Sequence, residues 1–262
     1  MILYNLGCEG WIPTQNETCC FLVEHKGHLI MLDAGTGVSN IVNYQDVLKK
    51  YDTLHIILTH YHLDHIAGLS YLPPFVRDKR LCIYGPGIPS YNKSTAEILN
   101  DFFQPHFFSR PLYQLAREVK CVDYAMDSFF SIDTILIHCK KQMHSSPSYS
   151  IRIDNELLYV TDTFFDARRW ADEQTVKVLL HECWQLHDDI NQHKHSSLDA
   201  LLHGLPLNNF KKILLIHQNP MWDKQEIDQI SKAIDGTNIF LPSDLNIVEI
   251  AEDDTNISSY DH

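Results

Sequence analysis

Four potential metal ligands lie within six positions near residue 60 of this chain. They are His60, His62, Asp64 and His65, in the stretch THYHLDHIAG over residues 59–68. The apolar run LHIIL over residues 54–58 predicts a buried strand that ends just before them. Past a strand end, side chains two positions apart can still point the same way, so His60 and His62 are expected to face one metal ion. The alternative, a polar loop with four solvated side chains, is disfavoured by so dense a cluster.

Asp64 and His65 are adjacent, so their side chains should diverge where the chain turns into a helix predicted over residues 66–71. Divergence suits a second ion beside the first. Two ions about 3.5–4 Å apart can hold both the attacking and the leaving oxygen of a displacement at phosphorus. The motif therefore predicts a metal-dependent hydrolase with a dinuclear centre.

Three more potential ligands each follow an apolar run. They are His144 after residues 135–139, Asp162 after residues 157–160, and His217 after residues 213–216. Open α/β sheets collect functional loops at the carboxyl ends of their strands. A lone histidine is more often a hydrogen-bonded structural group, but the order of this set along the chain favours metal binding.

THYHLDH resembles the HxHxDH signature of the metallo-β-lactamase superfamily, and LDAGTG over residues 32–37 is similar to its second landmark. The resemblance runs from about Leu3 to about His217. It implies an α/β fold, the four-layer αββα sandwich of two central sheets flanked by helices. We expect one metallo-hydrolase domain over residues 1–250 and an acidic polar tail over residues 251–262.

The resemblance also implies a ligand set for two divalent metal ions. One ion is held by His60, His62 and His144, the other by Asp64, His65 and His217, and Asp162 spans both. Asp33 supports the loop that carries the candidate ligands at residues 60–65 and is not itself a ligand. Five imidazoles and two carboxylates suit Zn²⁺, and Mn²⁺ is the alternative. The zinc β-lactamases commonly have a cysteine where Asp162 stands, so the chain departs from that branch.

A second pair of motifs, HEC at residues 181–183 and HSS at residues 195–197, resembles motifs of the transfer-RNA-processing, ribonuclease Z-like phosphodiesterases. The resemblance implies that His195 protonates the leaving alkoxide and that Glu182 orients His195; Asp64 is the third residue expected in catalysis. A carboxylate beside an imidazole favours the charged form of the imidazole. Alternatively, His195 only caps the following helix, a role that Ser196 or Ser197 can also fill.

The spacing of the motifs bears on the substrate. Only 18 positions separate His144 from Asp162, and two short strands with a turn at Asp154 and Asn155 fill them. No room remains there for the arm with which transfer-RNA-processing relatives grip their substrate. The aromatic-rich stretch over residues 92–124 is the place for a relocated arm, but it is predicted to be a helical cover on the core or a dimer contact.

Charge and composition exclude several other classes. The net charge is −13, whereas large nucleic acids usually bind basic surfaces. There is no run of 18 apolar residues, so no membrane span or membrane partner is expected. MILYNLGC at the start predicts a first strand rather than a signal peptide. Seven cysteines without a CxxC pair favour a reducing, cytoplasmic compartment.

These observations predict a phosphodiesterase that hydrolyses a small phosphodiester, expected to be a cyclic nucleotide, by attack of a metal-bridging hydroxide. In its length and its set of motifs, the chain resembles the anti-Pycsar enzymes of bacteriophages and their bacterial relatives, which hydrolyse cyclic-nucleotide immune signals as homodimers. A homodimer is therefore expected. The alternatives are a transfer-RNA 3′-processing endonuclease, a thioester or lactone hydrolase of the same fold, and a catalytically silent module. The Glu182–His195 pair argues against the second, and the complete ligand set against the third.

Overall fold

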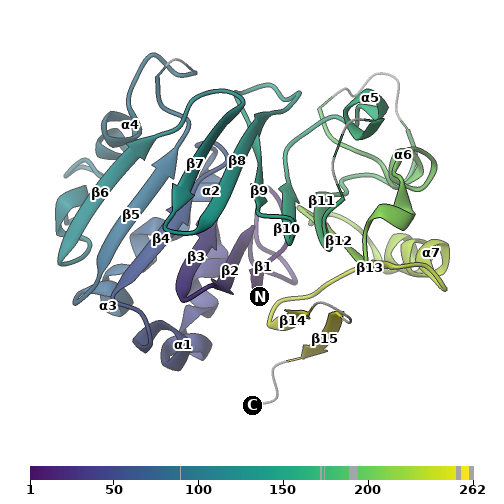
Figure 1. The fold of residues 1–262 in the computed structure, drawn as a ribbon, viewed down its shortest axis with the longest axis horizontal. Coiled ribbons are helices and arrows are strands. Elements are labelled where there is room, and N and C mark those ends of the chain that lie inside the picture. The colour runs from purple at the N-terminus through teal and green to yellow at the C-terminus, as the bar shows by residue number, and fades with distance from the viewer. Residues whose placement is uncertain (89, 172, 174, 189–193, 252–254, 260–262) are drawn as a thin grey trace.

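Two β-sheets pack face to face in the computed structural model, with helices on both outer sides (Figure 1). The structure describes residues 1–88, 90–171, 173, 175–188, 194–251 and 255–259. Helices of the first half of the chain lie on one side of the sandwich, and α5, α6 and α7 lie on the other (Figure 1). No helix within these residues is long and apolar enough to cross a bilayer.

The first sheet has the strand order β15-β14-β1-β2-β3-β4-β5-β6 among the described residues. Its strands are β1 (Ile2–Gly7), β2 (Cys20–His25), β3 (His28–Leu32), β4 (Thr53–Ile57), β5 (Arg80–Gly85), β6 (Glu118–Asp123), β14 (Asn246–Ile250) and β15 (Thr255–Ser259). The neighbours from β3 to β6 run parallel. Their carboxyl ends therefore lie along one edge of the sheet.

The second sheet has the order β13-β12-β11-β10-β9-β8-β7. Its strands are β7 (Ser128–Ile132), β8 (Ile135–Lys141), β9 (Tyr149–Ile153), β10 (Leu157–Val160), β11 (Val178–Glu182), β12 (Lys212–Ile216) and β13 (Ile239–Phe240). Strands β10 to β13 are parallel. The predicted hairpin between His144 and Asp162 is confirmed as β9 and β10, with the turn residue Asp154 in the left-handed region at φ 48°.

Helical segments cover the outer faces of the sheets. They are η1 (Thr36–Tyr44), α1 (Gln45–Lys49), α2 (Leu63–Ile66), η2 (Ala67–Tyr71), α3 (Pro73–Val76), α4 (Thr95–Phe102), η3 (Leu112–Gln114), α5 (Ala167–Ala171), α6 (Leu198–Gly204), η4 (Leu207–Asn209) and α7 (Lys224–Ile234). The helix predicted over residues 66–71 begins earlier, at Leu63, and continues as the 3-10 segment η2.

The structure has three apolar layers, which explains why the sequences of the central strands are apolar at nearly every position. In β3, Ile30 and Leu32 join the core between the sheets, whereas Leu29 and Met31 face the first helical layer. A third layer lies between the second sheet and α5 to α7, around Leu179. Strands buried on both faces lose the polar alternation of half-exposed strands. The predicted four-layer αββα sandwich is confirmed.

Within the stretch over residues 92–124, the part before β6 forms the predicted cover on the first sheet. Its α4 and η3 bury Leu99, Phe103 and Leu112 in the first helical layer. Phe107 and Tyr113 stay exposed. The other predicted role of this stretch, a dimer contact, stays a prediction.

The prediction of a polar tail from residue 251 onward is wrong for Thr255–Ser259, which form β15 antiparallel to β14. Thr255 is buried, and Ile257 packs against the core between the sheets. Alternate positions of this short segment thus face inward, but its polar composition hides that pattern. The rest of the predicted tail, apart from Ala251, lies outside the described residues.

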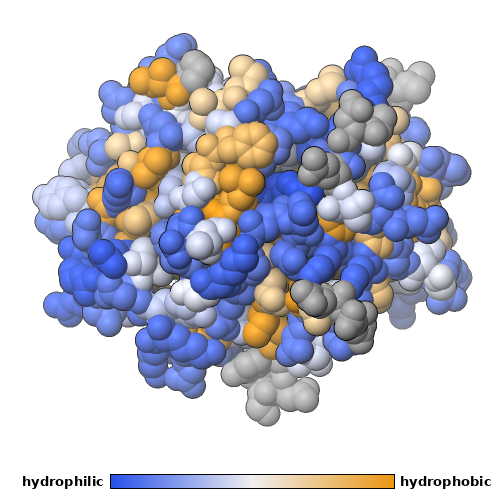
Figure 2. Space-filling view, in the orientation of Figure 1, coloured by the Kyte–Doolittle hydropathy of each residue, from blue (hydrophilic) through white to orange (hydrophobic). Residues whose placement is uncertain are grey.

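No helix within the described residues covers the outer surface of the second sheet at β7 and β8. On the face shown in Figure 2, apolar side chains gather over β7 and β8, where Phe129 and Leu136 are exposed. Phe129 stacks on His138 of the neighbouring strand, with ring centroids 4.0 Å apart. The helices of the second layer leave these two strands bare and instead cover β10 to β13 (Figure 1).

Candidate metal centre

The seven predicted ligands converge at the edge of the sandwich where the parallel strands end. His60, His62, Asp64 and His65 follow β4; His144 follows β8, Asp162 follows β10, and His217 follows β12. Asp162 and His217 both have positive φ, 47° and 46°, which turns the chain sharply at the strand ends. Ligand atoms of these residues fall into groups whose members all lie within 4.8 Å of one another.

The first group contains His60, His62, His144 and Asp162. His60 Nε2 lies 2.9 Å from His62 Nδ1. Asp162 Oδ1 lies 3.4 Å from His144 Nε2 and 3.8 Å from His60 Nε2. Three imidazoles therefore surround one oxygen of a buried carboxylate.

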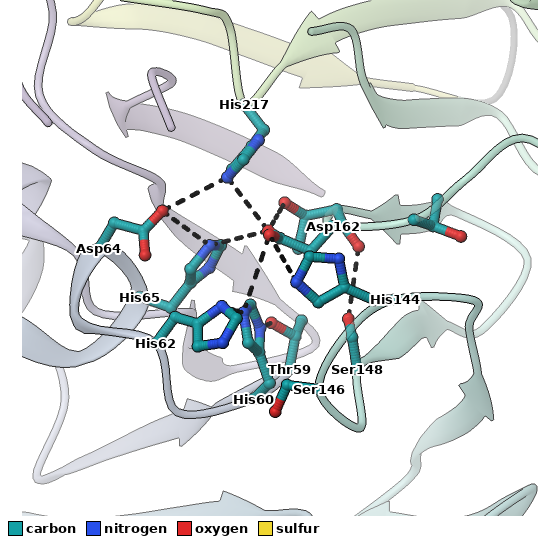
Figure 3. Close-up of polar contacts among 12 residues, drawn as sticks. Thr59, His60, His62, Asp64, His65, His144, Ser146, Ser148, Asp162 and His217 are labelled. Carbon is teal, nitrogen blue, oxygen red and sulfur yellow. Dashed lines mark hydrogen bonds and ion pairs between the residues drawn. The ribbon is translucent and has the colours of Figure 1, made fainter. Parts of the chain in front are cut away.

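The second group contains Asp64, His65 and His217. Asp64 Oδ2 lies 3.4 Å from Nε2 of both histidines. The second oxygen of Asp162 lies 2.9 Å from His65 Nε2 and 3.1 Å from His217 Nε2. Figure 3 shows Asp162 between the two groups, with one oxygen toward each.

The donor atoms fit a pair of metal ions. Nε2 of His65, His144 and His217 is buried and has no hydrogen-bond partner of acceptable geometry within the described residues. Leaving such atoms unsatisfied is costly, and coordination to a cation removes that cost. Burial opposes the charge of Asp162, but His217, His65 and His60 outweigh it and hold the pKa of Asp162 well below its usual range. The His/Asp cluster is thus suited to a dinuclear metal site.

Asp33 fixes the loop that carries the first four ligands. Its buried carboxylate accepts hydrogen bonds from the Thr59 backbone N–H at 2.7 Å and from Tyr159 Oη at 2.8 Å. The same carboxylate lies 2.7 Å from His65 Nδ1. A bond at Nδ1 sets the ring orientation and leaves Nε2 as the ligand atom. Asp33 therefore contacts the metal loop at both of its ends, as expected of a brace.

Glu182 and His195 lie together beside the second group. Glu182 ends β11 and is fully buried, with Oε2 2.8 Å from His195 Nδ1. Its other oxygen accepts the backbone N–H groups of Thr163 and Ser196 at 2.8 and 3.0 Å. Burial opposes ionisation of Glu182, but His195 and His217 outweigh it and lower its pKa to about 2. A ligand atom of His195 also lies within 4.8 Å of those of Asp162 and His217.

Helix capping does not explain the position of His195. The N-cap of α6 is Ser197, whose hydroxyl accepts the backbone N–H of Ala200. His181, the first residue of the HEC motif, is buried on the opposite face of β11 and packs against Trp170. Of the two motif histidines, only His195 reaches the metal cluster.

Two tryptophans at the site were not singled out by the sequence. Trp184 stacks on His195, with ring centroids 4.9 Å apart and planes 27° apart, and also lies beside His217. The backbone N–H of Trp11 donates to Asp64 Oδ2 at 2.8 Å. Trp184 directly follows the HEC motif, which was the one available signal; nothing in the spacing pointed to Trp11.

Two family models match the chain. The model of the metallo-beta-lactamase superfamily matches residues 14–83, which contain the HxHxDH motif. The model described as anti-Pycsar protein Apyc1 matches residues 86–235, more than half of the chain. Together they span all seven candidate ligands and the Glu182–His195 pair.

Curated relatives of the chain are named ribonuclease Z. The protein from Clostridium acetobutylicum is 28% identical over 160 residues, 58% of this chain and 49% of the relative. The match to Methanopyrus kandleri is 33% identical over 90 residues and covers 32% of that relative. The chain thus spans about half or less of the length of these relatives. A ribonuclease Z from Thermococcus sibiricus is aligned over 94% of this chain at 21% identity.

Solved structures share the fold at low identity. YhfI, a metallo-beta-lactamase fold protein from Bacillus subtilis, superposes with a TM-score of 0.71 at 19% identity, covering 94% of this chain and 97% of its own. A diphosphatase of the PhnP family gives a TM-score of 0.72 at 15% identity, covering 95% and 98%. The short form of human tRNase Z gives 0.67 at 17%, covering 96% and 100%. From the two family models, this chain belongs to the metallo-beta-lactamase superfamily and to the anti-Pycsar protein Apyc1 family.

Proposed function

We propose that this protein is a metal-dependent phosphodiesterase that hydrolyses a small phosphodiester, namely a cyclic nucleotide. The observation that carries the proposal is a two-group ligand cluster with an imidazole–carboxylate pair directly beside it. The 2.8 Å contact of His195 with Glu182 supports proton delivery to a leaving oxygen, which a simple metal-storage site does not need. Membership of the anti-Pycsar family supports the choice of a cyclic nucleotide.

In this proposal His60, His62 and His144 would hold one divalent ion, expected to be Zn²⁺. Asp64, His65 and His217 would hold the other, and Asp162 would serve as a ligand to both. When bound, the two ions supply a water molecule that is acidic near neutral pH and neutralise charge on the phosphoryl oxygens. The protein holds the donors in place beforehand, since Asp33 orients His65 and the turns at Asp162 and His217 aim their side chains inward.

His195 acts as the general acid. Its Nδ1 donates to Glu182, so the opposite ring nitrogen is the atom that carries the proton to the departing alkoxide. Two backbone N–H groups hold the other oxygen of Glu182, so the carboxylate keeps its orientation as the proton moves. A ribose alkoxide is a poor leaving group, and this proton transfer makes its departure possible.

The test is to incubate the purified, zinc-loaded protein with 3′,5′-cyclic nucleotides and, separately, with precursor transfer RNA, with and without chelator. We expect rapid, chelator-sensitive opening of the cyclic diester. Cleavage of precursor RNA without turnover of any cyclic nucleotide would replace this proposal with the runner-up.

The runner-up, a transfer-RNA 3′-processing endonuclease, is favoured by the relatives named ribonuclease Z. Two features weigh against it. The segment between His144 and Asp162 is filled by β9 and β10, which leaves no space for a gripping arm. The net charge of −13 also opposes binding of a large polyanion.

The family membership also supports a homodimer formed by one metallo-hydrolase domain per chain. The seven cysteines without a CxxC pair support a cytoplasmic location. Ligands come from both sheets, so neither half of the chain can hold the metal pair alone. Sedimentation at micromolar concentration tests the dimer; a monomer under conditions of full activity would refute it.

A further inference from the structure

The loop between β1 and β2 exposes apolar side chains beside the metal cluster. Trp11 is 62% exposed and Ile12 39%, and Met221 on the loop after β12 is 67% exposed. The two loops lie against each other: Gly10 N donates to Gln218 O at 3.0 Å, and Thr14 Oγ1 donates to Pro220 O at 3.3 Å. Trp11, Ile12 and Met221 together are called the apolar rim.

The rim is attached to two of the candidate ligands. Trp11 donates its backbone N–H to Asp64 Oδ2 at 2.8 Å. Gly10 packs so tightly on the ring of His217 that an added Cβ would lie 2.4 Å from Cε1. Any side chain at position 10 would collide with His217, so glycine is required there. The backbone is therefore held against His217 at Gly10 and against Asp64 at Trp11.

The rest of the loop is fixed by a buried carboxylate. Glu9 is 4% exposed and accepts hydrogen bonds from the backbone N–H groups of Thr14, Gln15 and Asn16 and from the Thr14 hydroxyl. Hydrogen bonds to a carboxylate are among the strongest that a loop can make. The loop is consequently arranged in advance to present the side chains of Trp11 and Ile12.

Trp11 occupies a conformation that suits a different residue. Its φ is 62°, in the left-handed region where glycine or asparagine is cheaper than a bulky side chain. Strain of this kind persists at functional sites, where the surrounding structure imposes it. The indole is mostly exposed and contributes little to the core. A strained, exposed tryptophan beside a reaction centre indicates a ligand-binding role.

We infer that the apolar rim binds the planar aromatic base of the substrate, with the indole of Trp11 as the stacking surface. The inference rests on the proposed function, in which the phosphate of the same molecule lies at the metal cluster. Indole stacks on the face of any base and so discriminates poorly among bases, while Ile12 and Met221 add apolar contact around it. The rim thus distinguishes nucleotides from phosphates that lack a base.

Binding can be measured without turnover by titrating zinc-loaded protein with adenosine 5′-monophosphate and with ribose 5-phosphate in a calorimeter. The two ligands share a phosphate and a ribose and differ in the base. We expect adenosine 5′-monophosphate to bind roughly tenfold more tightly, within the range that stacking on an aromatic side chain provides. Trp11→Ala should remove this difference and leave the affinity for ribose 5-phosphate unchanged, whereas Trp11→Phe should keep part of it.

Controls separate the possible causes. Tyr113→Ala removes another exposed aromatic side chain, on η3, and should leave the preference intact. Trp11→Gly relieves the positive φ and replaces Trp11→Ala should that variant fold poorly. Equal affinity of the wild-type protein for both ligands, or an equal loss for both in Trp11→Ala, overturns the inference. One more result would overturn the inference: a Trp11→Ala variant that sediments as a monomer while its ligand preference is unchanged. That result would mean that the apolar rim is a dimer contact. Absence of cyclic-nucleotide turnover would overturn only the proposed function.

Discussion

At the scale of single residues, His195 is the group whose replacement best separates metal chemistry from proton transfer. Its ring contacts Glu182, Trp184 and His217 and lies close to Asp162. We predict that His195→Ala slows hydrolysis of diesters with alkoxide leaving groups by roughly 10²–10⁴-fold, the usual contribution of a general acid. Esters of p-nitrophenol should be much less affected, since nitrophenolate leaves without a proton. An equal loss on both substrates, with zinc content unchanged, would assign His195 another role.

Trp184 is predicted to position His195. Its indole covers one face of the imidazole at 4.9 Å, and His217 stacks on His195 at 5.5 Å. Removing the indole frees the ring to rotate, so Trp184→Ala should slow alkoxide release selectively, as His195→Ala does. Trp184→Phe should retain most of the rate. In the His195→Ala background, Trp184→Ala should change little; additive losses would mean that Trp184 acts elsewhere, for example on His217.

Asp244, which is not one of the candidate metal ligands, links stability to pH. Burial, with the charges of Glu17 and Glu9, raises its pKa to about 7, against the hydrogen bonds from the Glu17 backbone N–H and from Asn40. The folded protein therefore binds this proton more tightly than the unfolded chain. The stabilising contribution is complete below about pH 4 and is lost as the pH rises to about 7.

Asp244→Asn mimics the protonated carboxyl and keeps an oxygen for both donors. We predict that this variant exceeds the wild-type free energy of unfolding at pH 8 by roughly 1–2 kcal/mol, and that the advantage disappears near pH 4. Denaturant unfolding at several pH values checks this. Asp228→Asn, on the exposed side of α7, is the control and should show no such trend. If Asp244→Asn raised the free energy of unfolding equally at every pH, the predicted loss of stability of the wild-type protein with rising pH would be refuted.

At the scale of elements, the strands that carry ligands were predictable because they are buried on both faces. The runs at residues 157–160 and 213–216 correspond to β10 and to all but the first residue of β12. Apolar runs of that length, each followed by a polar residue, are a strong local signal. Segment β15 was not predictable, since its inward face holds only Thr255 and Ile257.

The parts of the site that the sequence did not reveal depend on contacts between distant segments. Trp11 meets Asp64 across 53 positions, and Gly10, which follows a strand of the first sheet, packs on His217, which follows a strand of the second. Neither contact has a local pattern, because a single exposed tryptophan or a single glycine is common in loops. The candidate ligands could be predicted because few residue types bind metal ions, whereas exposed apolar residues in a loop give no comparable signal.

Helix α7 offers a test of element stability that is separate from chemistry. Asp223 caps it by accepting the Glu226 backbone N–H, and the Glu226 carboxylate in turn accepts the Asp223 backbone N–H. We predict that Asp223→Ala lowers the free energy of unfolding by about 1 kcal/mol, while Asp223→Ser loses much less. Zinc content and turnover should be unchanged. A loss of turnover would show that α7 positions the loop that follows His217.

At the scale of the whole molecule, the candidate ligands join the two sheets. His60, His62, Asp64 and His65 follow a strand of the first sheet, whereas His144, Asp162 and His217 follow strands of the second. Without ions, several buried nitrogens of these side chains have no partner among the described residues. Metal binding should therefore stabilise the sandwich as a unit.

We predict that loading with zinc raises the melting temperature by roughly 5–10 °C over chelated protein. A ligand at a hundredfold excess over its dissociation constant adds about 2.7 kcal/mol, and each kcal/mol moves the transition of a chain this long by about 2–4 °C. Asp162→Ala should abolish most of the shift, because both ions lose a ligand. His106→Ala removes an exposed histidine outside the cluster and should leave the shift intact. If elemental analysis finds two ions per chain and the melting temperature does not move, the ions do not connect the two sheets, and the ligand assignment across the sandwich fails.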